Sequence, residues 1–312
     1  MSTSQQSTVR VDLGGRSIAV PEGGLYDRYR MNPDLDEIAR DSRVSGVDFF
    51  RQLPKTKVDS LIGETYTPNF YYRMSSAWLT MLARSRAIRS RLPAELAPLE
   101  VFPGFGLVSV MFFRYDVCDI DFYTEAAVGI AVRPARHGKL GVADLLTGLD
   151  SDRLDSYVLS LPVSTEIAQV RGHEGYGFPK WVTEIEFDVD DARTTGRVLD
   201  DSGATDLALS VATPAQTGYP SGARVSTLTS YTSIKGGWHS TLSQTNVLSV
   251  GSTTMPRNVT LTMGHGRLSR DLRSLAPIKT LRLDVMSEGQ NALHMPVPTS
   301  VPTRAQDSTA PE

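Results

Sequence analysis

The sequence predicts an α+β fold that is predominantly antiparallel β, arranged as an antiparallel sheet or closed barrel with helices at its edges. From about residue 100 onward, the chain consists of short runs rich in Val, Ile, Thr, Tyr and Phe, separated by glycine and proline. Such runs are typical of strands joined by turns. Helical periodicity is confined to a few segments. Many strands with few helices favour an antiparallel sheet or closed barrel over a parallel α/β fold.

The strand prediction rests on β-branched and aromatic content between turn residues. The predicted strands are residues 106–110, 111–116, 127–133, 157–164, 181–189, 194–199, 207–213, 225–233, 237–248, 258–263 and 281–286. Gly104 and Gly106 are expected to belong to a turn between strands, because no helix and no third glycine of a dinucleotide-binding motif follows them.

Three segments predict helices. Residues 33–40 begin with proline and continue with early acids, which are helix start signals. Residues 75–92 space their apolar side chains near the helical period and end before Pro93, so this segment is expected to be the main helix. Residues 142–149 predict a short connecting helix.

Composition limits the possible partners. The 312 residues carry a net charge of -3, with 40% hydrophobic and 21% charged residues, as in an ordinary globular protein. Acids and bases are interspersed, so we expect no nucleic-acid partner and no anionic membrane partner. The single cysteine, Cys118, precludes an intrachain disulfide, and the five histidines lack metal-ligand spacing. We therefore expect no metal and no cofactor.

The ends of the chain bear on location and domain limits. No apolar N-terminal run and no stretch of about 18 apolar residues occurs, which argues against secretion and membrane spanning and favours the cytoplasm. Residues 1–9 and 299–312 are polar and aperiodic, so they are predicted to be mobile tails. Residues 10–298 are predicted to form a single domain.

One short run can carry chemistry. Lys180 follows the stiff turn Gly177-Phe178-Pro179 and precedes an apolar strand-like segment. Burial disfavours the charged form of a lysine, and a neutral amine is a nucleophile toward ketones. The alternative interpretation is a charge at a strand edge that prevents edge pairing. Alternation through residues 181–189 supports this alternative, because it places Lys180 off the most apolar face.

Several segments together resemble the acetoacetate decarboxylase family. The run Gly177-Phe178-Pro179-Lys180, with Glu174 six residues before the lysine, resembles the active-site segment of that family. Tyr123-Thr124-Glu125 is similar to its acid-bearing strand and loop, Arg73 to its early arginine, and residues 275–281 to its C-terminal strand entry. The resemblance implies an antiparallel barrel or cone with an interior site, and usually a homo-oligomer.

The resemblance also implies a mechanism and roles for named residues. Lys180 would form a Schiff base with a small oxo acid or ketone, and Glu125 would transfer protons. Arg73 would hold the substrate carboxylate through its planar guanidinium. The other predicted substrate-binding residues are Phe178, two residues before Lys180, and Trp181, directly after it.

Departures from the family pattern leave the reaction open. The decarboxylase has a second lysine where this chain has Trp181, and a second acid where this chain has Val110. Decarboxylation is the leading expectation. The alternatives are an aldolase-dehydratase or cyclase that uses the same lysine, or a barrel that binds small molecules without catalysis. Cys118 lies among aspartates that disfavour a thiolate, so it is not expected to be a nucleophile.

Overall fold

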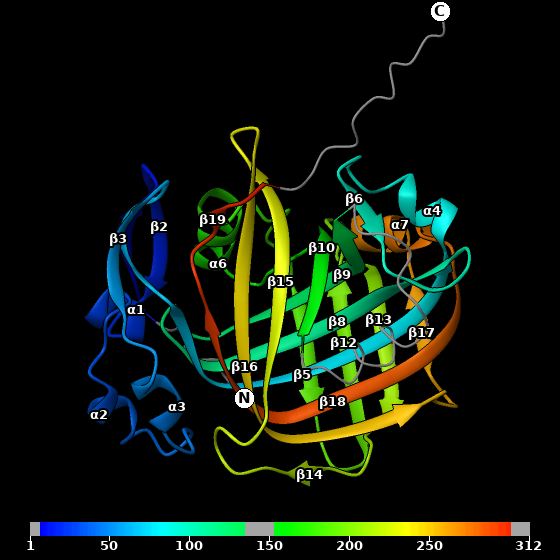
Figure 1. The fold of residues 1–312 in the computed structure, drawn as a ribbon. Coiled ribbons are helices and arrows are strands. Elements are labelled where there is room, and N and C mark those ends of the chain that lie inside the picture. Colours follow the sequence, from blue (N-terminus) through cyan, green and yellow to red (C-terminus); the bar gives the residue numbers. More distant parts are fainter. Residues whose placement is uncertain (1–6, 135–152, 301–312) are drawn as a thin grey trace, which may run out of the picture.

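A computed structural model describes residues 7–134 and 153–300. Its main body is a closed, mixed barrel of seven strands (Figure 1). These are β5 (Asn69–Arg84), β8 (Phe105–Cys118), β9 (Tyr123–Pro134), β10 (Arg153–Ser160), β15 (Val225–Ile234), β16 (Gly237–Thr254) and β18 (Pro277–Leu293). The order is β9-β10-β15-β16-β18-β5-β8, and β8 pairs with β9 to close the ring. Only the β10–β15 pair of this ring is parallel, so the predicted, predominantly antiparallel barrel is confirmed.

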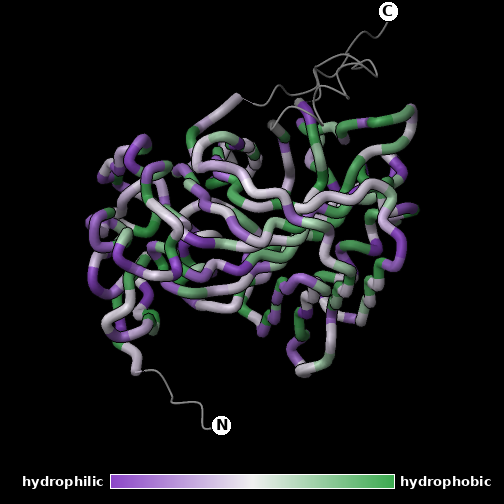
Figure 2. The backbone as a smooth tube through the Cα atoms, turned by 90° about the horizontal axis from the view of Figure 1, so that it is seen from below, coloured by the Kyte–Doolittle hydropathy of each residue, from purple (hydrophilic) through white to green (hydrophobic). Residues whose placement is uncertain are grey.

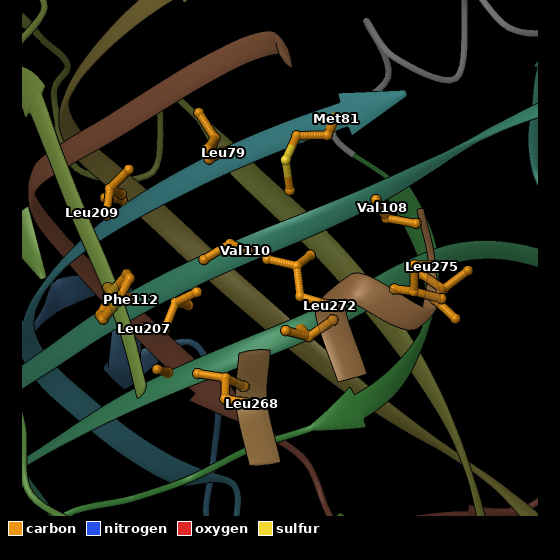
Figure 3. Packing of buried hydrophobic residues seen from close by; sticks show 14 of the residues in the cluster. Leu79, Met81, Val108, Val110, Phe112, Leu207, Leu209, Leu268, Leu272 and Leu275 are labelled. Carbon is orange, nitrogen blue, oxygen red and sulfur yellow. The ribbon is translucent and has the colours of Figure 1, made fainter. Parts of the chain in front are cut away.

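A second, four-stranded antiparallel sheet packs against one face of the barrel strands. It consists of β11 (Ile185–Val189), β12 (Arg193–Leu199), β13 (Thr205–Ala212) and β17 (Thr260–Met263), and α7 (Arg267–Ser274) packs beside it. Figure 3 shows the resulting core, in which Val110 and Phe112 of β8 meet Leu207 of β13. The side-chain-free Gly196 of β12 lets the Phe112 ring approach, because a Cβ there would lie 2.6 Å from it.

The remaining elements surround this body (Figure 1). Two hairpins are formed by β1 (Thr8–Leu13) with β2 (Arg16–Pro21) and by β3 (Thr56–Ser60) with β4 (Gly63–Thr67). The short strands are β6 (Leu96–Pro98), β7 (Glu100–Phe102), β14 (Thr217–Gly218) and β19 (Val297–Pro298). The short helices are α1 (Leu25–Tyr29), α2 (Leu35–Ile38), α3 (Asp48–Arg51), α4 (Ser85–Arg89) and α6 (Glu166–Val170), followed by a π-helical turn, η1 (Arg171–Gly175).

The helix predicted at residues 75–92 was wrong. Most of this segment belongs to β5, and only Ser85–Arg89 forms a helix, α4. β5 lies between β18 and β8, and side chains on both of its faces are covered. A strand that is buried on both faces loses the polar alternation that identifies strands in a sequence. The apolar spacing of this segment therefore imitated a helix.

Other expectations differ in detail. The short helix predicted at 33–40 is confirmed as α2, whose Asp34 side chain accepts a hydrogen bond from the Asp36 N–H at 2.8 Å. The strands predicted at 106–110 and 111–116 form one strand, β8, and the strand predicted from residue 181 begins at Ile185. α7 was not predicted. The helix expected at 142–149 lies outside the described residues.

Hydrophobic residues occur in short runs along the described part of the chain (Figure 2), since most strands and helices contribute to the packing. Figure 2 shows hydrophobic and hydrophilic residues interspersed along the backbone. In the ranges that the structure describes, no helix is long and apolar enough to cross a membrane. β1 begins at Thr8, inside the segment expected to be a mobile tail, and the domain limits stay a prediction.

Candidate active site

Three segments run side by side and bring Glu125 to Lys180. Residues 161–163, which follow β10, hydrogen-bond to the start of β9 on one side, where the Ala126 N–H donates to the Pro162 carbonyl at 3.0 Å. On the other side the Val163 N–H donates to the Trp181 carbonyl at 2.9 Å. Glu125 and Lys180 therefore come together although they are 55 residues apart in the sequence.

The turn before Lys180 is held by backbone hydrogen bonds to the π-helical turn. The Phe178 N–H donates to the Gly172 carbonyl at 2.9 Å, and the Lys180 N–H donates to the Phe178 carbonyl at 2.8 Å. Gly177 adopts a φ of +72°, and a Cβ there would also lie 2.8 Å from Ile234, so this position requires glycine. π-helical turns occur frequently at functional sites because they widen the helix locally.

The Lys180 amine lies against a buried carboxylate. Its Nζ is 2.5 Å from Oε2 of Glu125, and each of the two side chains is only 8% exposed. Gly172 leaves the space for the lysine stem, because a Cβ at this position would come within 2.3 Å of the Lys180 Cδ and Cε. The alternation expected from residue 181 does not apply to Lys180, since the strand begins only at Ile185.

Three tyrosines surround this pair. The Tyr115 hydroxyl donates to Oε1 of Glu125 at 3.2 Å, and the Tyr123 hydroxyl donates to that of Tyr71 at 3.1 Å. The Lys180 Nζ lies 5.8 Å from the centre of the Tyr123 ring. Burial raises the pKa of all three phenols well above the usual value, and the Glu125 charge acts in the same direction. The three hydroxyls therefore stay protonated at neutral pH and can donate hydrogen bonds.

A small cavity of about 20 Å³ lies beside the amine and is lined by Tyr71, Tyr123, Phe178 and Lys180, among others. Its size is comparable with the space that one water molecule needs, about 10–15 Å³. A substrate must therefore displace water and shift the neighbouring side chains. The cavity fits a small substrate better than a large one.

Sequence reasoning missed three polar residues that line the same cavity: Asn69, Arg171 and Tyr176. All three are at most 3% exposed. Arg171 and Tyr176 belong to the segment that leads to Lys180, so their position near the lysine was a usable signal. Asn69 is the first residue of β5, more than 100 residues earlier, and gave no local signal.

The structure does not bring all of the predicted site residues together. Phe178 lines the cavity, but Arg73 and Trp181 do not. The Arg73 side chain is 40% exposed and donates to the Arg43 carbonyl at 2.9 Å, in a separate surface depression. The Arg267 guanidinium lies over the Trp181 ring, and its Cζ is 4.1 Å from the centre of that ring. Their substrate-binding roles stay predictions, and this geometry does not support them.

Two other groups lie away from the amine or are chemically inert. Glu174, the acid six residues before the lysine, pairs with Arg16 of β2 at 2.9 Å. Burial raises the pKa of the Cys118 thiol well above its usual value, and the thiol donates to the Asp121 carbonyl. Among the residues described, no group of three or more His, Cys, Asp or Glu side chains is placed to hold a metal ion.

Comparisons with known proteins identify the family and the fold. The sequence model of the acetoacetate decarboxylase family matches residues 61–289, which include both Glu125 and Lys180. The acetoacetate decarboxylase of Legionella pneumophila is similar in structure, with a TM-score of 0.52 at 12% identity over 75% of this chain and 87% of that one. No curated protein sequence gives a match.

A second similar structure is the enduracididine biosynthesis enzyme MppR complexed with pyruvate. Its TM-score is 0.52 at 16% identity, over 75% of this chain and 91% of that chain. At such low identities the structural likeness shows the shared fold, and the family assignment rests on the sequence match over residues 61–289. The chain belongs to the acetoacetate decarboxylase family.

Proposed function

We propose that the protein is a carbon–carbon lyase in which Lys180 forms a Schiff base with a small oxo acid and Glu125 transfers the protons. The observation that carries this proposal is the buried contact of 2.5 Å between the Lys180 amine and the Glu125 carboxylate, beside a small cavity. A proton can pass along this hydrogen bond to the carboxylate, which leaves a neutral amine. Acetoacetate decarboxylase is an established example of an enzyme whose lysine is activated by desolvation or by a neighbouring cation; in this protein Trp181 takes the place of that cation, so activation rests on the burial of Lys180.

The first reaction that we propose is decarboxylation of a 3-oxo acid. The amine of Lys180 attacks the ketone carbon, and the hydroxyl of the resulting carbinolamine leaves as water after it takes a proton from Glu125. In the iminium so formed, the bond to the carboxylate carbon breaks, carbon dioxide departs and the electron pair moves to the nitrogen. Protonation of the enamine carbon and hydrolysis of the imine then release the ketone and restore Lys180.

The second candidate is an aldol-type reaction or cyclisation through the same enamine. Two features favour it. Trp181 and Val110 stand where the decarboxylase pattern has a lysine and an acid, and Trp181 packs against Arg267 rather than the cavity. An enamine formed from a 2-oxo acid attacks an aldehyde carbon, which makes a carbon–carbon bond instead of breaking one.

Turnover assays separate the two reactions. Purified protein is incubated with acetoacetate or other 3-oxo acids while carbon dioxide is measured, and with pyruvate plus an aldehyde while carbonyl consumption is measured. Lys180→Met should abolish either activity, whereas Lys279→Met, which changes an exposed lysine of β18, should leave it unchanged. If Lys180→Met keeps full activity, the Schiff-base proposal is wrong.

The location and assembly of the protein remain part of this proposal. We propose a cytoplasmic homo-oligomer that acts on a metabolite without a metal or cofactor. Size-exclusion chromatography with light scattering would give the subunit number.

A further inference from the structure

We propose that Arg171, Asn69 and Tyr176 form an anion-binding end of the cavity, which holds the carboxylate that a 2-oxo acid substrate keeps during the reaction. This inference rests on the proposed Schiff-base chemistry of Lys180 and names the substrate class of that site. All three residues line the same small cavity as Lys180.

The charge of Arg171 lacks a counter-charge in the described part of the protein. Arg171 is 3% exposed, and its Nη1 donates a hydrogen bond to the neutral Thr65 hydroxyl at 3.1 Å. The second terminal nitrogen, Nη2, is buried without a hydrogen-bond partner among the residues that the structure describes. A buried cation that is neither paired nor fully hydrogen-bonded is costly, so such a site is expected to bind an anion.

The other buried cations differ from Arg171 in this respect. Lys180 is paired with Glu125, and Lys55 is paired with Asp119. In both cases a carboxylate of the chain itself compensates the charge. Among these three buried cations of the described segments, only Arg171 makes no ion pair.

Asn69 and Tyr176 add neutral hydrogen-bonding groups to the same cavity. Neither the amide nitrogen nor the amide oxygen of Asn69 has a partner within residues 7–134 and 153–300. The buried Tyr176 hydroxyl has no protein partner there other than the neighbouring Arg171 guanidinium. Burial raises the pKa of Tyr176, while the Arg171 charge acts in the opposite direction, which places the two groups within electrostatic reach of each other. Buried polar groups are usually satisfied in native proteins, so a cluster of open ones indicates a missing ligand.

A carboxylate fits these groups better than another anion does. The guanidinium, the amide N–H and the phenol supply donors to a planar group with two oxygens. The amine of Lys180, on the same cavity, is then positioned for the carbonyl carbon next to that carboxylate.

The bound carboxylate is expected to be retained because of where the charge moves during reaction. In a decarboxylation the carboxylate loses its negative charge as carbon dioxide forms, so an ion pair with Arg171 would stabilise the ground state more than the transition state. In enamine formation from a 2-oxo acid, a proton leaves the methyl carbon and the carboxylate keeps its charge throughout. The Arg171 ion pair is then maintained and does not oppose the reaction.

The test compares two carbonyl compounds of similar shape, pyruvate and methyl pyruvate, in which a neutral methyl ester replaces the carboxylate. The rate of borohydride-trapped adduct formation is measured for the unchanged protein and for Arg171→Gln. We expect Arg171→Gln to slow trapping by pyruvate by roughly 30-fold or more and to leave trapping by methyl pyruvate within about twofold of the unchanged protein. Equal effects on both compounds, or no effect on pyruvate, would overturn the proposal.

A second variant and a second measurement keep the test independent of folding and of the lysine chemistry. Asn69→Asp is nearly isosteric and supplies Arg171 with an internal carboxylate, so it should keep the fold and remove the preference for pyruvate. Lactate has the carboxylate but no carbonyl, so it should raise the melting temperature of the unchanged protein and not that of Asn69→Asp. Lactate that stabilises both proteins equally, or neither, contradicts the anion site. If neither carbonyl compound forms an adduct but lactate still stabilises, the Schiff-base proposal alone fails.

Discussion

At the scale of single residues, the position of Lys180 depends on a residue without a side chain. Gly172 belongs to the π-helical turn, and a Cβ there would overlap the Lys180 stem at 2.3 Å. Because Gly172 has no positive φ, alanine is compatible with its backbone. The effect of adding a methyl group should therefore fall on the lysine and not on the turn.

Gly172→Ala is expected to displace the Lys180 amine from Glu125 and to reduce the rate of Schiff-base trapping by about 100-fold, since a misplacement of 1 Å can cost this much. The matched control is Gly175→Ala in the same turn, where a Cβ would make an ordinary contact of 3.4 Å with Ile62. Trapping rates are measured for both variants, with circular dichroism as a check on folding. Equal rates for the two variants would contradict this role of Gly172.

Tyr115 orients the Glu125 carboxylate through its hydrogen bond of 3.2 Å. Tyr115→Phe keeps the ring packing and removes only the donor, so a loss of about 1 kcal/mol or roughly fivefold in rate is expected. The rate of trapping with pyruvate at neutral pH measures it. An unchanged rate would show that this donor does not position the carboxylate.

At the scale of elements, the sequence predicted strands from their composition, but it did not show which strand is buried on both faces. The strands predicted at 225–233 and 237–248 are confirmed as β15 and β16, because these runs are rich in β-branched residues and are separated by a turn. β5 was read as a helix because neither of its faces is polar, and only its neighbours β18 and β8 explain this. Pairing with strands that are distant in the sequence determines that such a segment forms a strand, so local patterns cannot identify it.

The candidate site was predictable in the same uneven way. Lys180, Phe178 and Glu125 lie in recognisable motifs, and the structure places all three at or beside the cavity. Asn69 and Arg171 were missed because their significance comes from burial without a partner, which depends on the packing of distant segments.

The packing of the small sheet on the barrel makes a further prediction. Gly196→Ala places a Cβ 2.6 Å from the Phe112 ring, and overpacking of this kind typically costs about 1–3 kcal/mol. Urea unfolding at neutral pH measures the loss. Gly218→Ala serves as the control, because its nearest neighbour would be 3.9 Å away. A Gly196→Ala variant as stable as this control would contradict the close approach of β12 to β8.

At the scale of the whole molecule, the partly buried His294 makes the free energy of unfolding depend on pH. Burial lowers the pKa of this imidazole in the folded protein, and its Nε2 lies 2.7 Å from the Gln244 side-chain oxygen. The unfolded chain therefore binds a proton at higher pH than the folded protein does. The stability that the neutral His294 contributes is fully present above the pKa of the unfolded state, about 6.5, and is lost as the pH falls through the lower pKa of the folded state.

Removing this histidine should make the protein less sensitive to acid. The free energy of unfolding of His294→Gln is expected to fall less between about pH 7.5 and about pH 5.5 than that of the unchanged protein. His265→Gln, at an exposed position before α7, is the comparison. If both variants lose stability to the same extent over this range, His294 is not the group responsible.

The whole fold serves to bring the Lys180 amine, the Glu125 carboxylate and a small cavity together in a buried place. The most direct test of this account is borohydride reduction of the protein in the presence of pyruvate or acetoacetate, followed by peptide mass spectrometry. We predict a reduced adduct on Lys180 alone, and none in Lys180→Met. An adduct spread over exposed lysines, or no adduct with either compound, would contradict it.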